Sequence, residues 1–335
     1  MFQPKLLKKW TDEQIEQMRD AIFVAGHRLA ELPLFGDDSL IRILDEHPRK
    51  DLGVNTMGSD PTRRSDWQEG DAAELDGATL LEITKRGRLW LNVRRVMDHH
   101  PEFLDIVNTL YDELETLCGE GMFNRSANLL ISSPSAMVYY HLDCPANMLW
   151  HIRGRKRVWA YPLESGIISP ETIEAVLTGE ASEELAYRKE YDRHAKVVDL
   201  EPGQMITWPQ HTPHRVVNTS GLNVSLSTEH MTQRALRKNN VYLANRHFRR
   251  MLGRGFTSTE IEGPAAALKE AAIRIVRRLP IVRPPQPQGF KYPITFQVNP
   301  RVPSGVRPLD VSHPANVSLD DVNVELRAED VAVLN

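Results

Sequence analysis

A histidine and an aspartate two residues apart stand in a segment with the pattern of a β-strand. The segment is Met137-Val-Tyr-Tyr-His-Leu-Asp143. Residues i and i+2 of a strand project from the same face, so His141 and Asp143 are expected to lie side by side. One imidazole and one carboxylate are two of the three protein ligands of a facial triad, which leaves positions open on one face of a non-haem Fe(II) ion. The pattern therefore indicates a metal site.

The third ligand has two candidates further along the chain. The segment 201–214 (EPGQMITWPQHTPH) holds a Pro-Gly turn, an apolar strand and a proline, and then His211 and His214. An H-x-D pair alone is weak evidence, because it often occurs by chance at the polar end of a strand. The pair is a stronger signal when a late His follows in the same β-rich block. On the residues alone, either His211 or His214 completes the triad.

Short β-rich segments separated by Gly and Pro surround these residues, a pattern typical of a sandwich, barrel or jelly roll. The expected strands are residues 127–132, 137–143, 147–152, 156–161, 196–200, 204–208, 215–218 and 223–228. An acidic stretch with a helical pattern, residues 164–194, interrupts them. A long insertion between core strands is often a lid or a substrate loop, so we expect this one to border the site.

Helical patterns flank the β-rich block on both sides. Apolar residues recur every three or four positions in residues 11–32, 77–86, 101–117 and 265–278, as in amphipathic helices. Three parts are therefore predicted. They are an N-terminal helical region packing on the core (1–123), a jelly-roll catalytic core with the insertion 164–194 (124–230), and C-terminal helices with a Pro-rich tail (231–335).

Composition excludes several classes of protein. The chain has 335 residues, 41% of them hydrophobic and 26% charged, and a formal net charge of −4; these values are typical of a soluble globular protein and exclude a disordered or fibrous chain. Two cysteines cannot form a disulfide framework, and no apolar run is long enough to span a membrane. The expectation is a soluble, cytoplasmic protein with no membrane partner.

The block 125–230 resembles the Jumonji-C-like 2-oxoglutarate oxygenases of the cupin superfamily, and its pattern is similar to that of the asparaginyl hydroxylase of the hypoxia-inducible factor. Five features match in order, and the family's spacing selects His214 over His211 as the metal ligand. The matched features are His141-Leu-Asp143, Asn147, Gly154-Arg-Lys156, the turn Pro202-Gly203, and Pro209 followed by four residues and His214.

The resemblance implies a double-stranded β-helix, a cupin-like jelly roll, with helical extensions. It also implies that His141, Asp143 and His214 hold Fe(II) as the catalytic group. The co-substrate 2-oxoglutarate would chelate the iron, and Lys156 would bind its distal carboxylate, since a buried charge pair keeps its strength at low dielectric. Asn147 would hydrogen-bond the co-substrate or the ligand set.

One position departs from the family pattern. A hydroxyl residue commonly stands three places before the first ligand and contacts the distal carboxylate, but Val138 occupies that place here. Val138 cannot donate a hydrogen bond. Tyr139, on the strand face of His141, and Thr228, on the last strand, are the candidates to replace it.

The implied reaction is hydroxylation of a C–H bond with dioxygen and 2-oxoglutarate. The primary substrate is unidentified, and a protein or peptide side chain is favoured over a small molecule by fold-level analogy. Two alternatives stay open: a metal-binding cupin without oxygenase activity, such as an isomerase or lyase, and a non-catalytic binding scaffold.

The C-terminal helices suggest a homodimer. The basic stretches 246–250 and 274–278 are read as solvated helix faces, so nucleic acid is not an expected partner.

Overall fold

The computed structural model describes residues 5–18, 20–72, 74–253, 257–276 and 293–309. Its helices are α1 (Asp12–Gln17), α2 (Asp37–Glu46), α3 (Gly77–Arg86), α4 (Val96–His99), α5 (Pro101–Cys118), α6 (Pro170–Leu177), α7 (Gln233–Leu252) and α8 (Gly263–Val276). Its strands are β1 (Phe23–Gly26), β2 (Leu52–Thr56), β3 (Gln68–Asp71), β4 (Leu89–Val93), β5 (Phe123–Ser132), β6 (Met137–His141), β7 (Ala146–Ala160), β8 (Lys196–Leu200), β9 (Gln204–Thr207), β10 (His214–Met231), β11 (Ile294–Val298) and β12 (Val306–Pro308).

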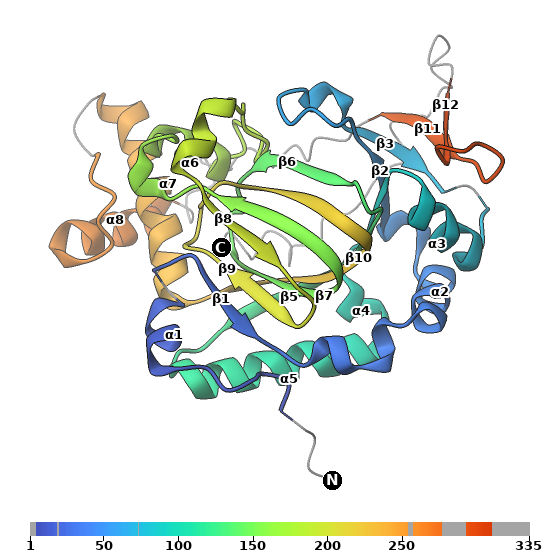
Figure 1. Ribbon diagram of the computed structural model, residues 1–335. Coiled ribbons are helices and arrows are strands. Elements are labelled where there is room, and N and C mark those ends of the chain that lie inside the picture. The colour runs from blue at the N-terminus through green and yellow to red at the C-terminus, as the bar shows by residue number, and fades with distance from the viewer. Residues whose placement is uncertain (1–4, 19, 73, 254–256, 277–292, 310–335) are drawn as a thin grey trace.

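The core is the mainly β, cupin-like jelly roll that the sequence predicts, with helices before and after it (Figure 1). The strands follow the order β1-β9-β7-β10-β5-β4-β2-β3-β11-β12, while β6 pairs with β10 and β8 pairs with β7. Adjacent strands are antiparallel except for β3 and β11, which are parallel. Every residue of the candidate metal site lies on this framework or on a loop next to it.

Two strands are longer than the sequence pattern suggests. The expected pairs 147–152 with 156–161 and 215–218 with 223–228 are each one continuous strand, β7 and β10. Gly154 and Gly221 have left-handed φ values of 79° and 68°. A Cβ at Gly154 would lie 2.7 Å from the Leu222 carbonyl oxygen, so only glycine fits there. The glycines therefore bend the two strands without ending them.

The N-terminal region is less helical than predicted. The Thr11 capping box forms, but α1 covers only six residues of the expected helix 11–32. Phe23–Gly26 instead pairs with β9 as strand β1, because ladder bonds and burial override a helical apolar period. Strands β2, β3 and β4 also lie in residues 1–123 and extend the sheet beyond β5. The helices expected over 77–86 and 101–117 are confirmed.

The Pro-rich tail is packed on the sheet in its described part. Strand β11 lies parallel to β3, and β12 pairs with β11. Phe296 is fully buried, and its ring fills the space beside Gly70 that a Cβ would need. Residues 277–292, which include part of the predicted tail and the last two positions of the predicted helix 265–278, lie outside the described residues.

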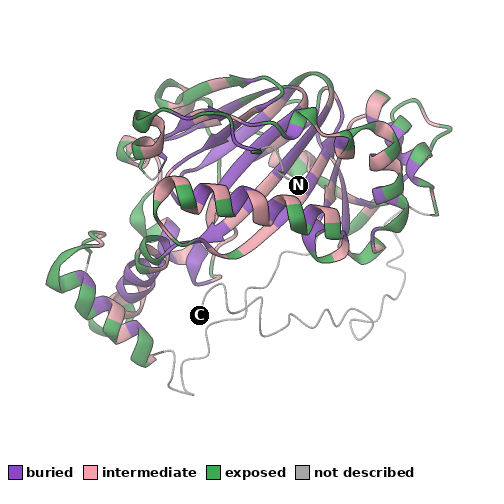
Figure 2. Cartoon of the chain, turned by 90° about the horizontal axis from the view of Figure 1, so that it is seen from below, coloured by how far each residue is buried: buried purple, intermediate pink, exposed green. Residues whose placement is uncertain are grey.

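Helix α5 covers the lower face of the core. Four residues of its apolar stripe, Phe103, Val107, Leu110 and Leu114, are buried together with Tyr111, whereas Leu117 is half-buried. In Figure 2 one side of this helix is buried against the strands and the other is exposed. Burial of such a stripe, at roughly 1.5–3 kcal/mol for each large apolar side chain, is what holds a helix on a sheet.

Helices α7 and α8 lie at the end of the molecule opposite β11 and β12 (Figure 1). The middle of α7, residues 239–245, is buried, while its end exposes Met251 and Leu252. No helix among the described residues is long and apolar enough to cross a bilayer.

Buried histidines give the fold a specific acid sensitivity. The His27 side chain is fully buried; its Nδ1 accepts from the Leu29 N–H at 3.1 Å, so its Nε2 donates to the Gln204 carbonyl oxygen at 3.1 Å. Burial lowers the pKa of His27 to about 4. Between about pH 6.5 and 4, His27 is therefore protonated in the unfolded chain and neutral in the folded chain.

We expect the free energy of unfolding to fall as the pH drops from about 6.5 towards 4, by up to about 3 kcal/mol from His27 alone. Urea unfolding at pH 7.5, 6 and 5 measures this change. His27→Gln should lower stability at pH 7.5 and flatten the decline. An unchanged decline in that variant would show that His27 does not contribute to it.

Candidate metal centre

Two neighbouring strands bring the predicted ligands together. His141, on β6, pairs in register with His214, the first residue of β10, and Asp143 follows β6 by two residues. The Nε2 atoms of His141 and His214 lie 3.7 and 3.5 Å from the two Asp143 carboxylate oxygens. One ligand atom from each of the three side chains lies within 4.8 Å of those of the other two. This donor set fits a divalent transition metal bound on one face.

Backbone carbonyls orient both imidazole rings. The His141 Nδ1 donates to the Tyr139 carbonyl oxygen at 2.7 Å, and the His214 Nδ1 donates to the Thr212 carbonyl oxygen at 3.2 Å. With Nδ1 holding the proton, each Nε2 presents its lone pair to the site. Such outer contacts fix the tautomer and the direction of a metal-binding histidine.

Burial favours the neutral forms of His214 and Asp143. Burial lowers the pKa of His214 well below its usual value and raises the pKa of the Asp143 carboxyl. A neutral imidazole is the form that binds metal, and a dication would favour the ionised carboxylate. The residues present therefore fit an implied Fe(II) ion.

Lys156 reaches the same cavity from β7. The cavity has a volume of about 260 Å³, and the three ligands and Lys156 all line it. The Lys156 side chain is 4% exposed, and burial lowers its pKa to about 7. No ion pair or hydrogen bond to its ammonium group is found among the described residues. A buried, unpaired cation that faces a cavity calls for an anionic ligand.

Strand alternation exposes the two neighbours of Lys156, Arg155 and Arg157, to solvent. Asn218 lies directly opposite Lys156 on β10 and also lines the cavity. Its Nδ2 donates to the Ser132 hydroxyl at 2.8 Å. Ser132 also lines the cavity, and the sequence patterns point to neither Asn218 nor Ser132.

Val138, Tyr139 and Asn147 all line the cavity. His214 pairs with His141, and Val216 pairs with Val138. Val216 is two residues after His214 on β10, but Val138 is three residues before His141 on β6, so β6 has one extra residue between the two pairs. This bulge turns Val138 to the face of His141.

Tyr139 packs with Trp67 and Trp90: its ring centroid is 6.1 Å from that of Trp67, and it lies in an apolar cluster with both tryptophans. Asn147 donates to the Ser227 hydroxyl at 3.1 Å. Its predicted contact with the co-substrate or the ligand set stays a prediction.

Two candidate residues of the sequence do not line the cavity. Thr228 does not line the cavity, because alternation on β10 turns Ser227 and Glu229 inward and Thr228 to the other face. There its hydroxyl accepts from the Trp150 Nε1 at 2.9 Å. His211, the other candidate for the third ligand, is 1% exposed and donates to the Asn239 Oδ1 at 2.8 Å.

Segments far from the motifs complete the cavity wall. Arg64, Trp67, Trp90 and Asn92 come from the N-terminal region, and Glu183 and Glu184 from the insertion. Arg64 Nε donates to a Glu184 carboxylate oxygen at 2.8 Å. The insertion pairs with the edge of β6 here, since Leu142 N–H donates to the Glu183 carbonyl oxygen at 3.1 Å. The insertion therefore borders the site as predicted, through its extended segment around Glu183 and Glu184 and not through its helix α6.

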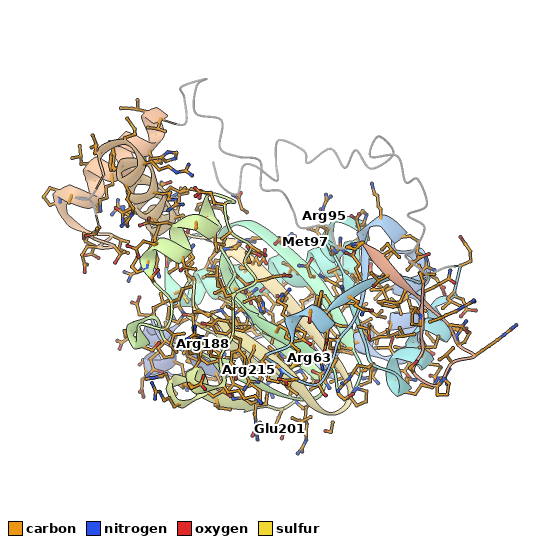
Figure 3. All side chains as sticks on the ribbon, turned by 90° about the horizontal axis from the view of Figure 1, so that it is seen from above. Arg63, Arg95, Met97, Arg188, Glu201 and Arg215 are labelled. Atoms are coloured by element: carbon orange, nitrogen blue, oxygen red, sulfur yellow. The ribbon has the colours of Figure 1, made fainter. Side chains whose placement is uncertain are left out.

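A polar cluster fixes the end of the insertion to the sheet. Asp192 accepts from the Tyr161 and Tyr187 hydroxyls at 2.6 and 2.7 Å and from the Arg215 guanidinium at 2.6 Å. The Arg215 guanidinium stacks 3.5 Å above the Trp159 ring centroid. Figure 3 labels Arg215, which belongs to β10, and Arg188, which belongs to the insertion. The segment that carries Glu183 and Glu184 therefore has a fixed end.

Comparisons with known proteins give a weak likeness in structure alone. No family model matches the chain, and no curated protein matches it. Among solved structures, Escherichia coli YcfD is 16% identical over 82% of this chain and 69% of its own, with a TM-score of 0.48. YcfD described as a ribosomal oxygenase in complex with cobalt and 2-oxoglutarate is 14% identical over 81% and 68%, with a TM-score of 0.47. Its complex with cobalt and succinic acid has a TM-score of 0.43 at 16% identity, over 82% and 68%.

Proposed function

We propose that this protein is an Fe(II)- and 2-oxoglutarate-dependent dioxygenase that hydroxylates a C–H bond. The observation that carries the proposal is the arrangement of His141, Asp143 and His214 in one cavity with the unpaired Lys156. The three ligands fit the facial triad of non-haem Fe(II) oxygenases. The proposal rests on these side chains and not on the weak likeness to YcfD.

The side chains divide the work of binding and orientation. When bound, the iron supplies the activation of dioxygen, which is the cofactor's own chemistry. His141, Asp143 and His214 hold it from one side, with their imidazoles fixed by the Tyr139 and Thr212 carbonyls. Lys156 would neutralise the distal carboxylate of 2-oxoglutarate and so set the direction in which the co-substrate enters. The apolar wall, which includes Val138 and Leu149, keeps water from this part of the cavity.

Lys156 argues against the two alternatives. A metal-binding isomerase or lyase, or a scaffold without activity, gives no reason to keep an uncompensated cation inside the core, where it costs stability. A 2-oxoglutarate oxygenase needs this cation, because the distal carboxylate of the co-substrate pairs with it.

A protein or peptide side chain is the proposed primary substrate. The likeness to the asparaginyl hydroxylase of the hypoxia-inducible factor rests on the sequence motifs alone, and YcfD is described as a ribosomal oxygenase. The rim formed by Arg64, Glu183 and Glu184 supports a polar substrate group. We also propose a cytoplasmic location and the three-part division at about residues 123 and 230.

The test of the function is the conversion of 2-oxoglutarate to succinate. The protein with Fe(II) and ascorbate should release succinate slowly alone and faster with its substrate, and pooled peptides provide the first screen. Asp143→Ala serves as the inactive reference. Succinate release that is equal in the wild type and in this variant would refute the proposal.

We further propose a homodimer formed through the C-terminal helices. Leu268 and Ile275 lie seven residues apart on one face of α8 and are 64% and 62% exposed, and Met251 and Leu252 at the end of α7 are equally open. A stable dimer buries about 800 Å² on each partner, and exposed apolar groups in such numbers mark a contact surface.

Light scattering at micromolar concentration should give twice the chain mass of 38.1 kDa. The double variant Leu268→Glu with Ile275→Glu should give the monomer mass, whereas Leu104→Glu, an exposed leucine on α5, should leave the dimer intact. A monomeric wild type would contradict this proposal and leave the enzymatic one untouched.

A further inference from the structure

The loop before His214 is bound to helix α7 by side chains that the chemistry described so far does not use. Gln210 and His211 are both buried in this loop. The Gln210 Nε2 donates to the Asn239 Oδ1 at 2.9 Å, and the His211 Nε2 donates to the same atom at 2.8 Å. The Lys238 ammonium donates to the Gln210 carbonyl oxygen at 2.9 Å. One face of α7 therefore holds the loop through three hydrogen bonds.

The same hydrogen bonds connect to the chain segments that carry Asp143 and His214. Besides Asn239, the Gln210 Nε2 contacts the Cys144 carbonyl oxygen at 2.8 Å, and Cys144 directly follows Asp143. On the other side, Thr212 follows His211, and its carbonyl oxygen orients the His214 ring. Asn239 and Gln210 thus connect the Asp143 segment, the His214 segment and α7.

The loop is held in a conformation that needs such support. His211 has a φ of 71°, in the left-handed region that costs a non-glycine residue about 1–2 kcal/mol. Pro209 and Pro213 flank the segment and limit how it can relax. The two hydrogen bonds to Asn239 offset this cost, because losing a partner would leave buried donors unsatisfied.

We propose that Asn239 is a positioning residue for the metal centre. By accepting hydrogen bonds from Gln210 and His211, it fixes the carbonyl of Thr212 and the segment after Asp143, and through them the direction of the His214 and Asp143 side chains. Helix α7 is then part of the metal site although none of its side chains lines the cavity. This inference rests on the metal site of the proposed function.

A cobalt titration of the full chain tests it, with Asn239→Leu as the main variant. Leucine keeps the volume and removes the acceptor. We expect cobalt to bind about tenfold more weakly, the lower end of the effect of losing an outer-shell partner. The visible absorption of the bound cobalt should also change, since it reports ligand geometry.

The chain offers a matched control in the next residue. Asn240 lies on the same helix, is 2% exposed against 3% for Asn239, and its Oδ1 has no hydrogen-bond partner among the described residues. Asn240→Leu should therefore keep the wild-type affinity and spectrum. Asn239→Asp, which keeps an acceptor at this place, should restore most of the affinity. Circular dichroism and thermal unfolding confirm that each variant is folded.

The outcomes separate the two claims. If the wild type binds no cobalt, the proposed metal site fails. If the wild type binds cobalt and folded Asn239→Leu binds it with equal affinity and an identical spectrum, the positioning role fails and the metal site stands. An equal loss in Asn240→Leu would also overturn the inference, because the effect would then belong to the helix as a whole.

Discussion

Replacement of Asp143 by alanine is expected to abolish metal binding at this site and, with it, the turnover of 2-oxoglutarate. Asp143 faces both imidazoles at 3.5 and 3.7 Å and supplies the charge that balances a dication. Loss of an outer-shell partner already costs about 10–100-fold in metal affinity, so loss of a ligand should cost more than about 100-fold. Calorimetric titration with Fe(II) under anaerobic conditions or with Co(II) measures the affinity.

The fold should survive this substitution. Burial raises the pKa of the Asp143 carboxyl, which shows that its ionised form is unfavourable in the metal-free protein. The melting temperature of the metal-free variant should therefore match or exceed that of the wild type. Glu229→Gln is the control, because Glu229 lines the same cavity outside the ligand group. Loss of metal binding in Glu229→Gln, or full binding in Asp143→Ala, would contradict the assigned ligands.

Replacement of Lys156 by methionine is expected to separate co-substrate binding from metal binding. Methionine has nearly the shape of lysine but no charge. A hydrogen bond to a charged group contributes about 1.5–3 kcal/mol, so the affinity for 2-oxoglutarate should fall by about 10–100-fold. Metal affinity should stay unchanged, and the metal-free variant should be more stable than the wild type, because a buried, unpaired ammonium is removed. Binding curves for 2-oxoglutarate and metal, with thermal unfolding, check all three.

The same lysine predicts a pH dependence. Burial lowers the pKa of Lys156 to about 7, and a bound dicarboxylate would raise it again. Co-substrate affinity should therefore decline as the pH rises above about 7, and Lys156→Met should lose this decline. Arg157→Met, at the exposed neighbouring position, is the matched control and should leave affinity and pH profile unchanged. Tight, pH-independent binding by Lys156→Met would show that another group holds the distal carboxylate.

The sequence predicts the centre of the site better than its surroundings. Spacing within one strand is enough to place His141 beside Asp143, and alternation is enough to turn Lys156 inward. The contact between His141 and His214 depends on the pairing of β6 with β10, which short-range patterns do not reveal. The same register explains why Val138 reaches the cavity and why Thr228, on the opposite face of β10, does not.

The cavity wall and the loop support are long-range features. Arg64 and Trp67 reach the site because β2, β3 and β4 extend the sheet, and each of these strands has only four or five residues. On the residues alone, His211 is as good a candidate for the third ligand as His214, but it is buried away from the ligand group. Its burial depends on α7, which packs against the loop through Asn239. Contacts between segments far apart in the chain decided each of these positions.

An anaerobic titration of the metal-free protein with Fe(II) and then 2-oxoglutarate tests the central claim most directly. We predict a visible charge-transfer band on addition of 2-oxoglutarate, absent in His214→Ala and weakened in Lys156→Ala. Iron binding without such a band would contradict the assignment of 2-oxoglutarate and favour a cupin without oxygenase activity. No iron binding by the wild type would contradict the metal centre itself.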